Sequence, residues 1–136
     1  MKKRLLAALL ATISILCLAG CGGKVSNVGI REVPSDIYTF KEIDDAATVV
    51  MNYFRQNFDG CELTELWYAG DEEKAQYDAL AARYGAGAAI VLKSNFTTGR
   101  SGGDGSLNPN ETYKNWKWIL ILNEDGSWSH ADHGYG

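Results

Sequence analysis

The sequence predicts a single α+β domain, in which an N-terminal helix packs on an antiparallel sheet of about four strands and a second, short helix follows the first strand. Residues 41–58 carry an apolar stripe at helical spacing. Strand-like patterns occupy residues 61–68, 88–97, 113–122 and 127–133. The last three of these strands follow one another with no intervening helix, which is typical of α+β folds rather than of βαβ alternation.

The first helix, predicted over residues 41–58, has a defined start and end. Thr39 and Glu42 are spaced as in a capping box, in which each side chain accepts a hydrogen bond from the backbone amide of the other. Asp59-Gly60 then ends the helix, because Gly readily adopts the left-handed turn found there. Apolar residues, mostly three or four apart, would form its buried face: Ile43, Ala47, Val50, Met51, Phe54 and Phe58.

The second helix is predicted over residues 71–84, with acidic residues at its positive end and Gly85 as its stop. Residues 113–122 form the strongest strand pattern, and Asn123-Glu124-Asp125-Gly126 is a hairpin turn to the last strand. One face of the 113–122 strand is strongly apolar and should pack into the core: Trp116, Trp118, Leu120 and Leu122.

The first twenty residues have the order of a secretory signal: a basic start, an uncharged run from Leu5 to Leu16, and small residues before a cysteine. Leu18-Ala19-Gly20-Cys21 resembles the lipobox of bacterial lipoprotein signals. The resemblance implies that residues 1–20 are removed and that the thiol of Cys21 carries a diacylglycerol. Two acyl chains hold a protein stably on a membrane, at about 0.8 kcal/mol per buried methylene.

An uncleaved transmembrane anchor is the alternative, because the uncharged run from Leu5 to Gly23 is close to the ~20 residues that a spanning helix needs. Polar and glycine residues in its second half weaken that alternative. Both interpretations place the domain at the extracytoplasmic face of the cell membrane. Residues 21–35 are expected to be a flexible tether that lifts a domain of residues 36–136 off the membrane.

Charge and cysteine content exclude some functions. Without residues 1–20 the chain keeps ten Lys and Arg against seventeen Asp and Glu, a formal charge of −7. Nucleic-acid binding needs a basic surface, so no nucleic-acid partner is expected. Cys17 leaves with the signal and Cys21 is acylated, so Cys61 remains alone and no internal disulfide is possible.

The order of elements resembles the cystatin-like, nuclear-transport-factor-like group of folds, in which a long helix lies across a curved antiparallel sheet. Three segments also resemble small uncharacterised lipoproteins of Gram-positive bacteria: Phe58–Tyr68, Ser101–Asn110 and Trp116–Leu120. These resemblances imply a cystatin-like domain in a cell-envelope lipoprotein and point to no particular reaction.

The Gly-rich loop of residues 99–112 is the first candidate binding element, because long structureless loops in small domains are often functional. Asp104, Ser106, Asn108 and Asn110 alternate as oxygen ligands do in a calcium loop. Pro109 and Asn115, however, stand where an EF-hand needs Gly and Glu. We therefore expect no metal or cofactor, and leave open a ligand contact or an ordered connection.

Aromatic and thiol groups supply the other candidates. Trp116 and Trp118 could line a ligand groove, although alternating Trp on a strand more often faces the core. Cys61 could pair with His130 or His133 as nucleophile and base, but nothing local supports this, and a buried inert thiol is the usual outcome. The two histidines lie three apart, which places them on opposite faces of a strand unless the chain bends after Ala131.

The sequence thus predicts a lipid-anchored extracytoplasmic protein whose domain is a non-catalytic binding or interaction module for a protein, peptide or small ligand. The alternatives are a cell-envelope enzyme or small-ligand binder using a pocket between helix and sheet, and an accessory subunit without a ligand. An enclosed pocket with converging polar groups favours the first alternative, whereas an exposed apolar patch favours a protein partner.

Overall fold

The computed structural model describes residues 22–135, so the predicted signal and Cys21 lie outside the described residues. The described chain is an α+β domain with two α-helices and one five-stranded mixed sheet. Its elements in chain order are β1 (Gly29–Arg31), α2 (Phe40–Asn57), β2 (Glu62–Tyr68), the short 3-10 helix η1 (Asp71–Glu73), α3 (Lys74–Tyr84), β3 (Ala89–Thr97), β4 (Thr112–Leu122) and β5 (Trp128–Gly134). The two predicted helices and four predicted strands are present, although residues 71–73 of the second helix form a 3-10 turn. The predicted antiparallel sheet of about four strands is wrong in one respect, because a fifth strand, β1, precedes α2 and makes the sheet mixed.

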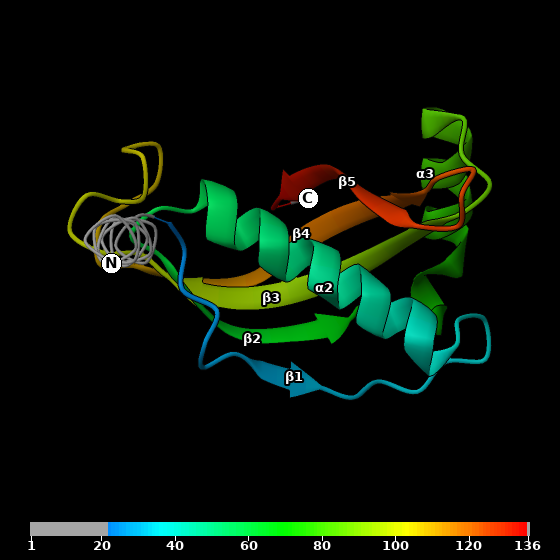
Figure 1. The fold of residues 1–136 in the computed structure, drawn as a ribbon, viewed down its shortest axis with the longest axis horizontal. Coiled ribbons are helices and arrows are strands. Elements are labelled where there is room, and N and C mark those ends of the chain that lie inside the picture. The colour runs from blue at the N-terminus through cyan, green and yellow to red at the C-terminus, as the bar shows by residue number, and fades with distance from the viewer. Residues whose placement is uncertain (1–21, 136) are drawn as a thin grey trace, which may run out of the picture.

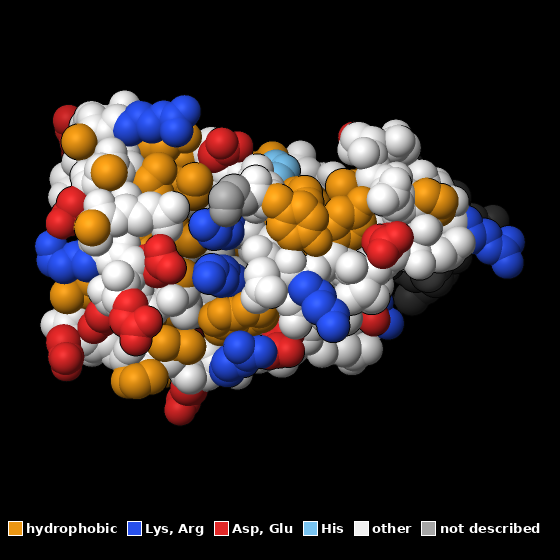
Figure 2. Space-filling view, turned by 180° about the vertical axis from the view of Figure 1, so that it is seen from behind, with side chains coloured by type: hydrophobic (Ala, Val, Ile, Leu, Met, Phe, Trp, Pro, Cys, Tyr) orange, Lys and Arg blue, Asp and Glu red, His pale blue; other side chains and the backbone are white. Residues whose placement is uncertain are grey.

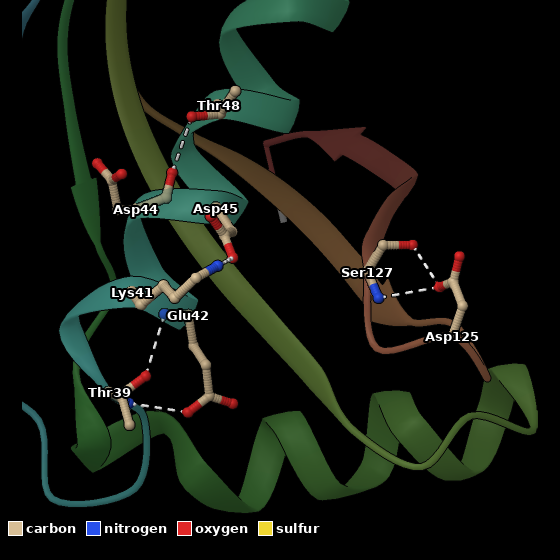
Figure 3. A network of polar contacts seen from close by, with 8 residues as sticks. All are labelled: Thr39, Lys41, Glu42, Asp44, Asp45, Thr48, Asp125 and Ser127. Atoms are coloured by element: carbon tan, nitrogen blue, oxygen red, sulfur yellow. Dashed lines mark hydrogen bonds and ion pairs between the residues drawn. The ribbon is translucent and has the colours of Figure 1, made fainter.

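Helix α2 begins at the predicted capping box. The Glu42 amide donates to Thr39 Oγ1 at 3.1 Å, and the Thr39 amide donates to Glu42 Oε1 at 2.9 Å (Figure 3). The helix lies across one face of the sheet (Figure 1) and buries a stripe of side chains against it: Ala46, Ala47, Val50 and Phe54. A fixed helix start and one buried face together set which side chains of α2 reach β4 and β5.

The sheet has the strand order β1-β2-β3-β4-β5, with β2 to β5 antiparallel and β1 parallel to β2. The core fills the space between this sheet and α2. On the predicted apolar face of β4, Trp116, Trp118 and Leu120 are buried, whereas Leu122 is only partly buried against the same core. Trp118 donates its indole N–H to Ser94 Oγ at 2.8 Å, so the only buried serine of the described chain satisfies a buried donor.

The expected flexible tether over residues 21–35 is wrong for the part that the structure describes. Residues 29–31 form β1 on the free edge of β2, and Lys24 pairs with Glu62 in a parallel bridge. Ser35 Oγ donates to Asp71 Oδ1 at 2.6 Å, which fixes the segment before α2 to η1. Backbone pairing to an open strand edge therefore orders residues whose composition is typical of a linker.

The face of the molecule away from α2 is mixed in character. Figure 2 shows apolar, basic and acidic side chains interspersed there rather than one continuous apolar patch. Trp67 is covered by the guanidinium of Arg31, 4.1 Å from the ring centroid, and Arg31 also pairs with Glu65. Among residues 22–135, neither helix is long and apolar enough to cross a bilayer.

Candidate functional site

A pocket of about 300 Å³ lies between the C-terminal half of α2, the Gly-rich loop and strands β4 and β5. This volume is at the small end of the range for ligand sites in proteins, roughly 300–1,000 Å³. The pocket is lined by Tyr53, Asn57, Phe58, Cys61, Gly103, Asp104, Ser106, Leu107, Trp116 and His133. Residues far apart in the sequence, from Tyr53 to His133, thus converge on one cavity between helix and sheet.

The loop wall of this pocket is held by hydrogen bonds to the loop's own ends. Thr98 Oγ1 donates to the Asn108 carbonyl at 2.6 Å and accepts from the Glu111 amide at 2.8 Å. The Asn110 amide donates to the Gly99 carbonyl at 2.9 Å. Asp104 Oδ1 accepts from both the amide and the hydroxyl of Ser106, and these bonds lower the pKa of Asp104. The loop is therefore an ordered wall rather than a loose connection.

The four oxygen-bearing loop residues do not converge on one point. All four are exposed, but only Asp104 and Ser106 line the pocket. Among residues 22–135, no group of three or more His, Cys, Asp or Glu side chains is placed to hold a metal ion. The arrangement therefore offers a polar rim to the pocket.

The two tryptophans singled out from the sequence have different environments. Trp118 is fully buried, and Ser94 accepts its indole N–H, so it belongs to the core. Trp116 lines the pocket and is 8 % exposed, and its Nε1 is buried with no hydrogen-bond partner among the described residues. A buried N–H without a partner costs about 1–3 kcal/mol. Trp116 therefore brings an unsatisfied donor to the pocket wall, and an acceptor that reaches Nε1 would remove this cost.

His130 and His133 lie together, which contradicts the expectation that they occupy opposite faces of β5. The adjacent residues Ile119 and Leu120 of β4 pair with Asp132 and His130, so Ala131 is an extra residue, a β-bulge. The bulge turns both rings to the same side, with His130 Nε2 and His133 Nδ1 3.0 Å apart. One ring therefore donates an N–H to the other.

The histidine pair is enclosed by aromatic rings. Tyr53 of α2 stacks on His130 with ring centroids 3.8 Å apart, and Trp118 and Phe58 lie 5.2 and 5.3 Å from His133. Burial lowers the pKa of His130, with a further decrease from the adjacent His133, and burial lowers the pKa of His133 too. The lowered pKa values favour the neutral form of both rings, and His133 lines the pocket.

This pair predicts a pH-dependent stability. Because both folded-state pKa values lie below the unfolded value of about 6.5, the unfolded chain binds more protons, and stability falls as the pH drops below about 7. We expect the urea midpoint to decrease between pH 7.5 and 5.5, and the H130Q/H133Q variant to lose most of that decrease. Hydrogen-bonded carboxylates such as Asp71 have lowered pKa values and titrate below this window. An equal decrease in the variant would assign the effect to other groups.

Cys61 and His133 line the same pocket, but their environment opposes a catalytic pair. The thiol is 2 % exposed, and the pKa of Cys61 is raised by burial and then by the carboxylates of Asp104 and Asp59. Its hydrogen-bond acceptor is the Asp59 carbonyl, 3.8 Å from Sγ. Thiolate nucleophiles instead sit beside cations or helix N-termini, so Cys61 remains a protonated wall group.

Comparison of the chain with protein-family models, with curated proteins and with solved structures gave no match. The chemistry of the pocket is therefore inferred from its own residues.

Sequence reasoning missed Tyr53, Asn57 and Leu107 as pocket residues. Tyr53 and Asn57 lie four apart on α2, which places them on one side of the helix next to the buried stripe. An aromatic ring with a polar tip at the edge of an apolar stripe is the signal that could have identified Tyr53.

A second, larger groove of about 530 Å³ lies between the N-terminal half of α2 and the segment that contains β1. Its rim exposes apolar side chains, because Phe40 is 73 % and Ile30 is 52 % exposed. Its other lining residues include Val33, Pro34 and Ile43. This groove holds neither the histidine pair nor the unpartnered indole, and it is the more apolar of the two surfaces.

Proposed function

We propose that this protein is a lipid-anchored extracytoplasmic lipoprotein whose domain binds a small ligand, without chemical conversion, in the pocket between α2 and the Gly-rich loop. The observation that carries the ligand-binding part is the unpartnered indole N–H of Trp116 in the pocket wall. Buried donors without partners are rare in folded proteins, and an acceptor on a bound ligand would satisfy this one. The anchoring part rests on the lipobox-like sequence that ends at Cys21.

The pocket wall defines the chemistry of the ligand. Aromatic faces of Tyr53, Phe58 and Trp116 favour a flat or apolar body. The indole N–H requires a hydrogen-bond acceptor, such as a carbonyl or ether oxygen. The carboxylate of Asp104 at the rim disfavours a ligand that carries a negative charge. A small neutral or cationic compound with an acceptor oxygen therefore fits best.

An enzyme of the cell envelope is the less favoured alternative. A nucleophile needs a base that can take its proton, whereas the thiol of Cys61 donates to a backbone carbonyl and faces carboxylates. The neutral histidines donate and accept between themselves. These contacts support a binding role over covalent catalysis.

The binding proposal is tested by nuclear magnetic resonance with a library of small neutral aromatic amides and lactones. We expect the compounds that bind to shift the Trp116 indole N–H resonance. Trp116→Phe keeps an aromatic face and removes the donor, so affinity should fall about tenfold, since a hydrogen bond is worth about 1–1.5 kcal/mol. Phe40→Ser, in the other groove, is the matched control and should bind normally. Equal affinity of Trp116→Phe and the unchanged protein would show that the indole N–H takes no part in ligand binding.

The proposal includes the cystatin-like assignment of the fold. Helix α2 lying across the antiparallel strands β2 to β5 supports it (Figure 1). The parallel strand β1 departs from a purely antiparallel sheet, and it pairs at one edge without altering the helix–sheet pocket.

A protein partner is a second candidate, and it is favoured by the exposed apolar rim of the larger groove at Ile30 and Phe40. A photo-reactive phenylalanine analogue at position 40 in the native membrane tests it. A single discrete cross-linked product supports a partner at this groove, and recovery of the uncross-linked chain alone argues against one.

A further inference from the structure

The first described residues are seated on the domain by backbone hydrogen bonds. The Gly23 amide donates to the Arg55 carbonyl at 3.0 Å, and the Gly60 amide donates to the Gly22 carbonyl at 3.3 Å. Immediately afterwards, the Lys24 amide donates to the Cys61 carbonyl at 2.9 Å. The backbone that follows Cys21 is thus fixed to the end of α2 and the start of β2.

We call this contact of residues 22–24 with the domain the N-terminal seat. It leaves no room for side chains at Gly22 and Gly23, which explains why both residues are glycines. A Cβ atom on Gly22 would lie 2.3 Å from the Arg55 carbonyl oxygen, and one on Gly23 would lie 2.4 Å from the Phe54 carbonyl oxygen. Gly22 also has φ +132°, a conformation that L side chains rarely adopt. The two glycines therefore serve close packing here rather than flexibility.

The seat lies at the pocket end of the molecule. Gly60, which bonds Gly22, is also close to the Gly-rich loop, because its carbonyl oxygen lies 3.0 Å from a Cβ built on Gly99. Cys61, whose carbonyl accepts from Lys24, lines the pocket itself. In Figure 1 this end carries the Gly-rich loop, drawn in yellow, while the β4–β5 turn and α3 lie at the opposite end.

We infer that the bilayer surface covers this end of the domain and that the pocket sits at the membrane–water interface. The inference rests on the proposed acylation of Cys21. Cys21 and Gly22 are adjacent, so one peptide unit, about 3.8 Å, separates the acylated Cα from a fixed Cα. The anchor therefore sets which end of the domain contacts the membrane. The occupant is the surface of the lipid bilayer, and ligands reach the pocket from that interface.

The test uses the mature acylated protein, which begins at Cys21, in phosphatidylcholine vesicles that contain a lipid with a nitroxide on its headgroup. A bimane label is attached either at Arg100→Cys, on the exposed Gly-rich loop, or at Glu124→Cys, on the exposed turn after β4. The thioether consumes the Cys21 thiol, and Cys61 is buried, so each variant has one reactive thiol. We expect quenching at position 100 to exceed quenching at position 124 several-fold.

A linker variant separates orientation from anchoring. About twenty Gly and Ser residues inserted between Cys21 and Gly22 span roughly 25 Å, so they should equalise the two labels while the protein still floats with the vesicles. Equal quenching in the uninserted protein, or an unchanged difference after insertion, would overturn the orientation and leave the anchor intact. Failure of the uninserted protein to float would overturn the anchor, and with it the orientation.

Discussion

Replacing Phe54 by alanine is expected to destabilise the domain by about 3–5 kcal/mol, the range for removing a buried phenylalanine. Phe54 is fully buried on α2, stacks on Phe58 with centroids 4.8 Å apart, and meets Phe96 and Trp118 edge-on. Its ring also supports Gly23, since a Cβ built there would lie 2.7 Å from it. The cavity left behind would loosen both the core and the N-terminal seat.

The matched control for this experiment is Phe40→Ala, on the same helix. Phe40 is 73 % exposed, so its loss should change the free energy of unfolding by no more than about 0.5 kcal/mol. Urea unfolding followed by tryptophan fluorescence measures both variants. Similar costs for the two substitutions would mean that α2 does not pack on the sheet as described.

The second large effect is expected from Cys21→Ser in the native cell. A serine has no thiol to carry the diacylglycerol, so we expect the variant to leave the membrane fraction or to retain its signal segment. Cys61→Ala is the control, because it removes a buried thiol and leaves the proposed anchor in place. It should stay in the membrane fraction with some loss of stability.

Radioactive palmitate distinguishes the possible results for Cys21→Ser. The wild-type chain and Cys61→Ala should incorporate label, and Cys21→Ser should not. A Cys21→Ser variant that remains labelled and is extracted only by detergent would show that another residue carries the anchor.

The α2 helix and the strands β2 to β5 were predictable because each has a local signal. Thr39 and Glu42 mark the helix start, and Trp116, Trp118 and Leu120 alternate on β4. Strand β1 has no such signal, since its three residues are all exposed and are held by backbone pairing with β2 and by the contacts of Arg31 with Trp67 and Glu65. Its formation depends on a free strand edge that a local pattern does not contain.

Gly22 and Gly23 show why the tether was misjudged. A glycine pair is compatible with a flexible linker and with a close backbone contact, and only the position of the Arg55 and Phe54 carbonyls decides between them. The glycines have the same local appearance in both cases.

The candidate site was predictable only in part. Trp116 and the Asp104–Ser106 segment reach the pocket from elements that the sequence marks clearly. The contact between His130 and His133 depends on the bulge at Ala131, which arises from the register of β5 against β4. A one-residue change in register reverses the face of a side chain, so spacing alone gave the wrong face.

Intact-mass spectrometry of the native protein, extracted from its own membranes, tests the central claim most directly. The account predicts a chain that begins at Cys21 and carries the mass of a diacylglycerol. A cytosolic chain that retains residues 1–20 and carries no acyl mass would contradict it.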